Sequence, residues 1–290
     1  MNSYKIMTDS NADLTTDLID ELGVEVISTE YTIDGETFLN YPDHHEYDIH
    51  DFYQKLKAGA PSSTALINID RYMQFMENIL SAGDDLLYIC FSSGLSGSYG
   101  CAVTAAQELA EKYPERKLLV VDSLAASGGE GLLVYNAVMQ QRAGLSIEQL
   151  AKWVEDNRNH LCHWFTVDDL DHLKRGGRVS AAAAFFGGML GIKPVLHVDD
   201  EGHLIPMAKV RGRRASLDAL VAEMEKTVTE PENQLVYVCH ADCEADCDYV
   251  IEQIRAKMQV KEIRKGYIGP VIGSHSGPGT LALFFVGSHK

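Results

Sequence analysis

Apolar residues in the first half of the chain alternate between short continuous runs and helical spacing. The continuous runs predict buried strands at residues 4–7, 86–90 and 117–121, and a β-rich stretch at 24–33. Around them, apolar residues recur every three or four positions, which predicts helices. These helices are expected at 13–22, 48–56, 69–80, 99–113, 127–142 and 146–158. This alternation favours a Rossmann-like α/β domain, with a parallel sheet covered by helices on both faces.

The second half follows a different pattern. Strands are predicted at 163–167, 193–199, 205–210, 235–240, 262–268 and 281–286, and helices at 182–190, 214–228 and 244–258. Asp200-Glu201-Gly202 separates two of the strands, which is a hairpin signal. Hairpins mixed with long helices indicate an α+β domain. The sequence therefore predicts two domains, an α/β domain at 1–160 and an α+β domain at 161–290.

Composition excludes several classes of partner. The chain has 290 residues and a formal net charge of −17, which disfavours both a nucleic-acid partner and an anionic membrane surface. No apolar run approaches the roughly 18 residues that span a bilayer. The six cysteines are scattered, several of them in apolar runs, and no signal peptide pattern opens the sequence. These features are typical of reduced thiols in a cytoplasmic protein.

A loop rich in serine and glycine, at 91–102, joins a predicted strand to a predicted helix. Such a loop places hydroxyls and free backbone N–H groups together and suits an anion, although a plain serine-capped turn has the same composition. Gly94-Leu95-Ser96-Gly97-Ser98 comes close to the G-x-S-x-G elbow of serine hydrolases. Its last position is Ser98 rather than glycine, and no Asp and His follow in the expected order, which disfavours a nucleophilic Ser96.

Other hydroxyl groups follow predicted strands or a turn. Asp9-Ser10 and Asp122-Ser123 end two strands, and Ser62-Ser63-Thr64 forms a second cluster after Pro61. Ligands of open α/β sheets gather beyond the carboxyl ends of the strands, so these hydroxyls are candidates for a binding site. Each Asp-Ser pair also fits a helix N-cap.

Two further features lie in the second half. The stretch 266–279 is rich in glycine and proline, which predicts a tight loop around His275, either at a site or facing solvent. Lys174, Arg175 and Arg178 concentrate positive charge around Gly176-Gly177. That patch fits either a contact with an anionic group or a solvated helix end.

The sequence offers little support for a metal or a nucleotide cofactor. Cys239, Cys243 and Cys247 recur every four residues, whereas a zinc site typically uses closer pairs and four ligands. Neither a G-x-x-x-x-G-K-[ST] loop nor a G-x-G-x-x-G motif after a strand occurs. We therefore expect no metal and no cofactor on this chain.

Several short motifs occur in one order along the whole chain. They are MTDS at 7–10, the hydroxyl cluster at 61–64, SSGLSGSY at 92–99, VDS at 121–123, DDL and LKRGGR within 168–178, KPVL at 193–196, KVRG at 209–212 and HSGPG at 275–279. In this order they resemble the DegV family from end to end. The resemblance implies a two-domain fatty acid-binding protein rather than an enzyme. Some members of that family serve as the lipid-loaded subunit of a bacterial fatty acid kinase, whose separate ATP-binding subunit phosphorylates the bound acid.

The resemblance also implies roles for particular residues. The acyl chain would lie in a tunnel of the second domain, and the predicted helix at 181–190, with its small and large apolar residues, suits a tunnel wall. The carboxylate would meet Ser63, Ser96 and His275, with Ser62 and Ser93 beside them. Lys174, Arg175 and Arg178 would adjoin the ligand's exit, where the kinase subunit would dock. Transient contact of the protein with a membrane surface stays open and is assigned to no residue.

Two points qualify this picture. Ser63-Thr64-Ala65-Leu66 stands where the family usually has T-S-Q-P, so the chain preference or pocket shape is open here. The alternative function is a small-molecule hydrolase or acyltransferase that uses Ser96 with His275. A long acyl chain favours the carrier on physical grounds, because each buried methylene contributes about 0.8 kcal/mol.

Overall fold

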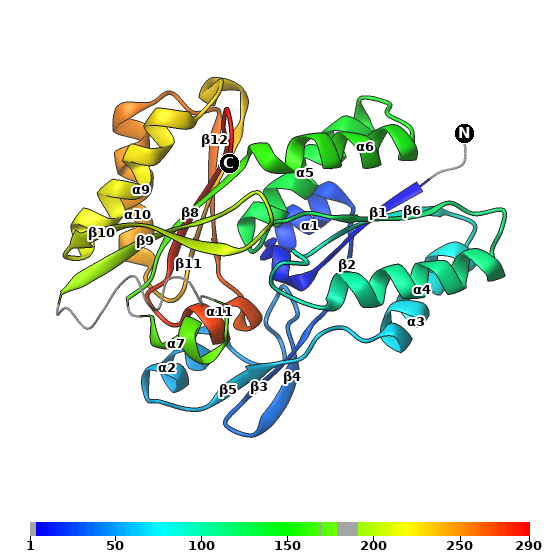
Figure 1. The fold of residues 1–290 in the computed structure, drawn as a ribbon, viewed down its shortest axis with the longest axis horizontal. Coiled ribbons are helices and arrows are strands. Elements are labelled where there is room, and N and C mark those ends of the chain that lie inside the picture. The colour runs from blue at the N-terminus through cyan, green and yellow to red at the C-terminus, as the bar shows by residue number, and fades with distance from the viewer. Residues whose placement is uncertain (1–3, 169, 179–190) are drawn as a thin grey trace.

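The computed structural model describes residues 4–168, 170–178 and 191–290 (Figure 1). A four-stranded sheet is built from the first part of the chain, and every neighbouring pair in it is parallel. In spatial order its strands are β2 (Glu25–Ile27), β1 (Tyr4–Asp9), β6 (Asp85–Cys90) and β7 (Leu118–Asp122). The parallel sheet predicted for this half is confirmed.

Helices cover both faces of this sheet, as predicted. One face packs against α3 (Ile69–Ser81) and α4 (Ser98–Lys112), and the other against α5 (Gly128–Arg142) and α6 (Ile147–Asn157). Alternate residues of β6 show the two faces, since Tyr88 belongs to the first core and Leu87 to the second. Strand β6 is entirely buried, which explains its continuous apolar run.

The second half forms a six-stranded mixed sheet, confirming the predicted change of fold (Figure 1). Only β11 and β12 pair in parallel among its described strands. Two helices, α9 (Arg213–Thr227) and α10 (Glu244–Lys257), pack on one face. In spatial order the strands are β10 (Leu204–Arg211), β9 (Ile192–Val198), β8 (Leu161–Thr166), β13 (Leu281–Val286), β11 (Leu235–His240) and β12 (Glu262–Tyr267).

The other face of the mixed sheet turns towards the first sheet. Phe165, Leu196 and Phe284 on this face share one apolar cluster with Leu87 and Leu133 from the first half. The sheets themselves divide near residue 160, but one buried cluster joins them. The division into domains 1–160 and 161–290 therefore stays a prediction.

A third, small sheet was not predicted. It is antiparallel, in the order β4 (Glu36–Leu39), β3 (Glu30–Ile33) and β5 (Ser62–Thr64), and it lies beside α2 (Ile49–Lys57) (Figure 1). The single β-rich stretch expected at 24–33 is in fact two strands in different sheets, β2 and β3. Asp34 and Gly35 both have positive φ, 54° and 84°, and join β3 to β4 as a tight hairpin turn.

Two other local predictions were wrong. The helix expected from residue 13 begins only at α1 (Thr16–Leu22), because Asp13 is in the left-handed region with φ 47° after a short 3-10 turn. The loop expected around His275 is a short helix, α11 (Pro270–Ser276). Pro270 occupies its first turn, and Gly277, with φ 81°, ends it, so proline and glycine here delimit a helix.

The basic patch begins on another short helix, α7 (Asp171–Arg175), so Lys174 and Arg175 do lie at a helix end, one of the two alternatives for this patch. The helix expected at 182–190, and with it the tunnel wall at 181–190, lies outside the described residues. No helix among the described residues is long and apolar enough to cross a membrane. All six cysteines are free thiols.

Candidate functional site

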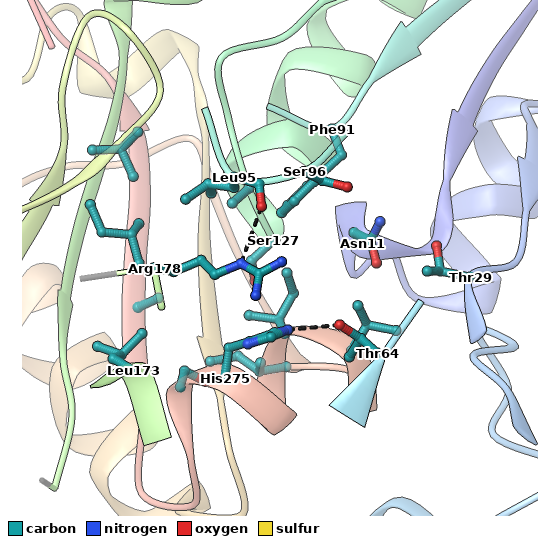
Figure 2. Close-up of a pocket in the computed structure, with 18 of the residues that line it drawn as sticks. Asn11, Thr29, Thr64, Phe91, Leu95, Ser96, Ser127, Leu173, Arg178 and His275 are labelled. Carbon is teal, nitrogen blue, oxygen red and sulfur yellow. Dashed lines mark hydrogen bonds between the residues drawn. The ribbon is translucent and has the colours of Figure 1, made fainter. Parts of the chain in front are cut away.

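A cavity of about 280 Å³ lies between the two larger sheets, bordered by β5, α11 and the loop after β6. We call it the pocket (Figure 2). Its lining comes from segments far apart in sequence. The lining residues are Asn11, Thr29, Thr64, Ala65, Leu66, Phe91, Leu95, Ser96, Gly97, Ser98, Ala126, Ser127, His163, Phe165, Leu173, Arg178, Val198, Leu204, Ile268, Val271, Ile272, His275, Ser276, Thr280, Ala282 and Phe284.

One side of the pocket, which we call the polar wall, carries hydroxyl and amide groups from the first half of the chain. Its members are Asn11, Thr29, Thr64, Ser96, Ser98 and Ser127. Ser96 and Ser98 share a hydrogen bond of 3.0 Å between their hydroxyls at the start of α4. The positive end of that helix dipole lies at this point, so the polar wall suits a negatively charged group.

His275, on helix α11, faces the polar wall. Its Nε2 lies 2.8 Å from the hydroxyl of Thr64, and Figure 2 shows the two side chains pointing towards one another. Burial is the main cause that lowers the pKa of His275 to about 4, and nearby Arg178 lowers it further. The imidazole is therefore neutral at physiological pH. A neutral imidazole can orient a carboxylate through a hydrogen bond but adds no charge of its own.

Arg178 supplies the charge that His275 does not. Its guanidinium donates from Nε to the carbonyl of Leu95 at 3.3 Å and reaches into the pocket beside His275 (Figure 2). The residue is exposed on its outer side, so it links the pocket to the surface. Arginine pairs with carboxylate or phosphate through planar, bidentate contacts.

Several buried polar atoms of the pocket have no hydrogen-bond partner among the described residues. These atoms are Asn11 Oδ1, Thr29 Oγ1, His163 Nε2, His275 Nδ1 and Ser276 Oγ. A buried polar atom without a partner costs about 1–3 kcal/mol, so such atoms are rare in native folds. Their concentration around one cavity points to a ligand with polar groups.

The opposite side of the pocket, which we call the apolar wall, comes from the mixed sheet, from strands β8, β9, β10 and β13. Its members are Phe165, Val198, Leu204, Ala282 and Phe284. The strand register places Phe165 opposite Ala282 and His163 opposite Phe284, so these side chains form successive rows across the sheet. This wall offers a long apolar surface to whatever the polar wall holds by one end.

Three of the predicted site residues, Ser96, His275 and Arg178, line the pocket together. The other predicted residues do not line it. Ser63 and Ser93 are exposed and Ser62 is half-buried, while Lys174 and Arg175 are exposed on α7. Lys174 pairs with Asp171 at 3.6 Å, and Arg175 bonds to His172 at 3.0 Å.

Thr64 lines the pocket in place of the predicted Ser63 because the two side chains point in opposite directions. Residues 62–64 form strand β5, in which neighbouring side chains point to opposite faces. Ser63, opposite Thr32, therefore faces away while Thr64 faces His275. Recognising β5 as a strand would have identified Thr64. Asn11, Thr29 and Ser127 were missed because strand ends and turns bring them in from distant parts of the chain.

The hydrolase alternative requires Ser96 to be activated by His275. Instead, the Ser96 hydroxyl bonds to Ser98, and His275 Nε2 bonds to Thr64. The remaining ring nitrogen of His275 has no acidic partner among the described residues; Gly176 packs so closely there that a methyl group on it would lie 2.3 Å from Nδ1. A histidine with a pKa of about 4 is also a weak general base at neutral pH. The geometry disfavours this chemistry.

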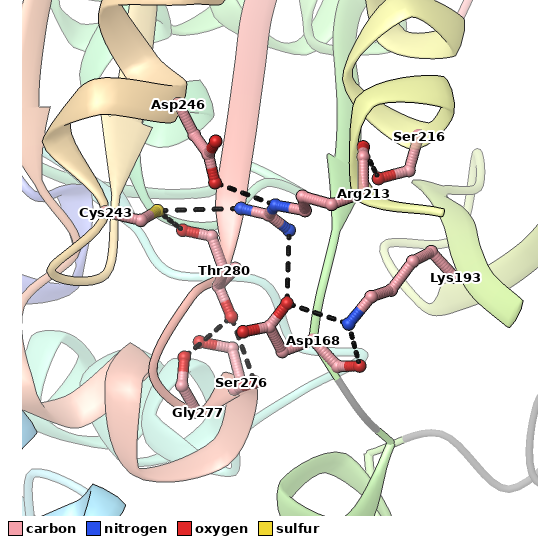
Figure 3. Close-up of polar contacts among 9 residues, drawn as sticks. All are labelled: Asp168, Lys193, Arg213, Ser216, Cys243, Asp246, Ser276, Gly277 and Thr280. Carbon is pink, nitrogen blue, oxygen red and sulfur yellow. Dashed lines mark hydrogen bonds and ion pairs between the residues drawn. The ribbon is translucent and has the colours of Figure 1, made fainter. Parts of the chain in front are cut away.

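The turn that follows His275 is held by an ionic network of the second sheet (Figure 3). Asp168 accepts from Lys193 at 2.9 Å and pairs with Arg213 at 3.8 Å. Gly279, with φ 76°, packs so closely that a methyl group there would lie 2.4 Å from Asp168 Oδ2. The Thr280 hydroxyl donates back to the carbonyls of residues 276 and 277. This turn therefore anchors the end of α11 that carries His275.

A buried carboxyl group supports the polar wall from behind. Asp13 accepts from the Ser127 hydroxyl at 2.5 Å and from the Gly269 N–H at 2.9 Å, directly before α11. Burial raises the pKa of Asp13 to about 7, against the effect of both hydrogen bonds. It also borders a second cavity of about 140 Å³. No group of three or more potential metal ligands gathers anywhere in the described part of the chain.

Comparisons with known proteins agree on one family. A family model described as "Uncharacterised protein, DegV family" matches residues 3–288. A DegV domain-containing protein of Clostridium perfringens is 44% identical over 290 residues, covering 100% of this chain and 99% of that protein. Solved structures share the fold over nearly the whole chain. A DegV lipid-binding protein from Thermotoga maritima has a TM-score of 0.87 at 28% identity, covering 99% of both chains. A fatty acid-binding DegV family protein from Thermus thermophilus has a TM-score of 0.87 at 29% identity, covering 98% of this chain and 99% of the other.

Proposed function

This chain belongs to the DegV family, and we propose that it binds a long-chain fatty acid in the pocket between its two larger sheets. The observation that carries the proposal is the division of that pocket into a polar and an apolar wall. A fatty acid has the same division, with a carboxylate at one end and methylenes along the rest. Similar proteins from Thermotoga maritima and Thermus thermophilus are described as binding lipid and fatty acid.

The carboxylate is the demanding end of such a ligand, because an unpaired buried charge is costly. We place it between Thr64, Ser96 and His275, with Arg178 near enough to supply positive charge. Charge-assisted hydrogen bonds from hydroxyls are short and strong enough to offset much of the desolvation. The Thr29 hydroxyl, which has no partner among the described residues, faces the same space and can donate to the carboxylate. The unpartnered Asn11 Oδ1 is an acceptor and cannot.

The apolar wall supplies the affinity. Each methylene removed from water contributes about 0.8 kcal/mol, so a long chain offers on the order of 10 kcal/mol before the costs of association. Binding is non-covalent, and the chain acts as a carrier. We extend the proposal to a partner: a separate ATP-dependent kinase subunit phosphorylates the presented carboxylate. The support is the family resemblance and the basic residues Lys174, Arg175 and Arg178, which sit beside the pocket of an acidic chain.

The test of ligand binding is direct. Protein purified from bacteria is extracted with organic solvent and the extract analysed by mass spectrometry, and delipidated protein is titrated with octadecanoic acid. We expect one fatty acid per chain in the extract and saturable binding in the titration. A protein that carries no fatty acid and also fails to bind octadecanoate and shorter acids would refute the proposal.

The kinase partner needs a second experiment. Acyl-phosphate formation is measured with ATP and the candidate kinase subunit of the same organism, beside fatty acid affinity. Replacing both Lys174 and Arg175 with alanine should lower acyl-phosphate formation at least tenfold while affinity changes little, because both side chains lie outside the pocket. Arg178→Ala should lower both, because Arg178 lines it. Unaltered phosphorylation in the double variant would remove α7 from the docking surface.

A further inference from the structure

One polar side chain stands among the apolar residues of the mixed sheet. His163, on β8, is 1% exposed and lines the pocket two residues before Phe165 on the same face of the strand. The register sets it opposite Phe284, and the two rings meet edge to face at 5.5 Å between centroids. The side chains that line the pocket beside it on the sheet, Phe165 and Phe284, are apolar, so the presence of an imidazole calls for an explanation.

The hydrogen bonds of His163 define its chemical state. Its Nδ1 lies 2.8 Å from the carbonyl of Leu161, so Nδ1 carries the proton and donates. Burial, the main cause, holds the pKa of His163 well below its usual value, so the ring is neutral. Its Nε2 is consequently an acceptor, and this atom has no partner among the described residues. A ligand that brings a donor to this point would recover the cost of leaving it unpaired.

Gly129, which packs against the ring, does not lie directly in front of this acceptor. Gly129, at the start of α5, packs so closely that a methyl group there would lie 2.0 Å from Nε2, 2.2 Å from Cδ2 and 2.9 Å from Cε1. These unequal distances place Gly129 against the side of the ring that joins Nε2 to Cδ2. The lone pair of Nε2 lies in the ring plane and points outwards, so an atom directly in front of it would be equally far from Cδ2 and Cε1. The methyl position is 0.7 Å nearer to Cδ2 (2.9 Å against 2.2 Å), so this contact does not cover the lone pair head-on.

We propose that the pocket selects fatty acids that carry a hydroxyl group in the middle of the chain, with the hydroxyl donating to His163 Nε2. This inference rests on the proposed function. It adds to it a class of ligand, the mid-chain hydroxy fatty acids, and a residue that reads the hydroxyl.

The strand register supports a mid-chain position. Thr280 lies in the turn next to α11, at the end where His275 holds the carboxylate, and it also lines the pocket. Phe284, opposite His163, is four residues further along the chain. Four residues along a strand cover about 13 Å, so the imidazole lies well past the head group. A hydroxyl next to the carboxylate would be too close to reach it, and a terminal hydroxyl would lie beyond it.

The first experiment compares affinities on delipidated protein. The ligands are octadecanoic acid and its 3-hydroxy, 10-hydroxy and 18-hydroxy derivatives. We expect the 10-hydroxy acid to bind about tenfold more tightly than octadecanoic acid, and the 3-hydroxy and 18-hydroxy acids to show no gain. His163→Phe should abolish this ratio, and His163→Gln, which keeps an acceptor, should restore part of it. The matched control is His197→Phe, because His197 is also buried with an unpartnered Nε2 but does not line the pocket.

A second measurement uses the protein without any substitution, so it does not depend on the folding of a variant. With 15N-labelled histidine, the Nε2 resonance of His163 reports whether that nitrogen accepts a hydrogen bond. We expect it to shift on addition of the 10-hydroxy acid and to stay in place with octadecanoic acid. Equal affinities for the two acids with equal resonance positions would overturn the inference, because a bound water or ordinary packing would then account for His163. Failure of every acid to bind would instead refute the proposed function itself.

Discussion

The two walls of the pocket differ in origin as well as in chemistry. The polar wall comes from turns and strand ends of the first half, such as Asn11 and Thr29, together with β5 and the start of α4. The apolar wall comes from regular strands of the mixed sheet, such as Phe165 on β8 and Ala282 on β13. Strand interiors present an ordered apolar surface, whereas turns gather hydroxyls and free N–H groups at one point.

This difference assigns two tasks to two parts of the chain. The apolar wall contributes affinity in proportion to the methylenes it covers, and it is insensitive to the charge of the head group. The polar wall contributes orientation, because it must satisfy a carboxylate that would otherwise be costly to bury. His275 and Arg178 come from the second half and complete the polar wall across the gap. The site is thus incomplete in either half alone.

The strongest expected effect concerns Asp13, the titratable group behind the polar wall. Its pKa is raised from 3.8 to about 7 in the folded chain, so the folded state binds more protons than the unfolded state between these values. The free energy of unfolding should therefore fall as pH rises from about 4 to 7, by roughly 4 kcal/mol from this group. Asp13→Asn should remove that part of the slope, measured by denaturant unfolding across this pH range. Parallel pH profiles of both proteins would contradict it. Burial also raises the pKa values of Asp9 and Glu130, and both residues keep that contribution in the variant; only the lesser effect of the Asp13 charge on Glu130 is lost with Asp13.

The second effect separates the walls by chain length. Val198 lies opposite His163 in the continued register of β8 and β9, where Trp164 pairs with His197, and it lines the apolar wall beyond Phe165. Val198→Trp should fill this part of the pocket and weaken octadecanoate binding at least a hundredfold, about 2.7 kcal/mol. Decanoate should lose far less, since it ends before the added ring. Calorimetric titration measures both. An equal loss for the two acids would show that the tail does not run along these strands.

A smaller effect is expected at the polar wall. Thr64→Val removes the hydroxyl that bonds His275 Nε2 and, by our proposal, meets the carboxylate. We expect octadecanoate affinity to fall by about 1–3 kcal/mol. The control is Ser63→Ala on the outward face of the same strand, with no expected change. Should Ser63→Ala cost as much as Thr64→Val, the inward direction of Thr64 would not be what matters.

The smallest effect is expected for Ser96→Ala. Its hydroxyl bonds Ser98 at the start of α4, so Ser98 can replace part of its contact with the ligand. A loss of about 1 kcal/mol is expected, near the lower end for a group that meets a charge. Ser93→Ala, in the same loop but exposed, serves as the matched control. A loss greater than that of Thr64→Val would place the carboxylate against α4 rather than β5.

The sequence predicted the regular elements better than the irregular ones. Long elements with strong periodicity, such as β6 and α4, follow directly from apolar spacing. Short elements do not. The strand β5 has three residues and no apolar pattern, and α11 is a helix only because Pro270 and Gly277 delimit it in its tertiary setting. Consequently Ser96 and His275 could be predicted as site residues, whereas the choice between Ser63 and Thr64 depended on a strand face that the sequence does not reveal.

Contacts between distant parts of the chain could not be predicted from the sequence. Asn11, Ser127 and His163 meet one pocket only because two sheets pack face to face across a shared core. The network of Asp168, Lys193 and Arg213 likewise joins the ends of separate elements. Such contacts depend on how the two sheets pack against each other, and local sequence patterns do not predict that packing.

The structure of the complex with octadecanoic acid would show directly whether the two walls hold the two ends of the ligand. We expect the carboxylate within hydrogen-bond distance of Thr64 and Ser96, facing His275, and the methylenes along Ala282 and Phe284. A carboxylate among the strands of the mixed sheet, or a chain bound outside the pocket, would contradict this expectation.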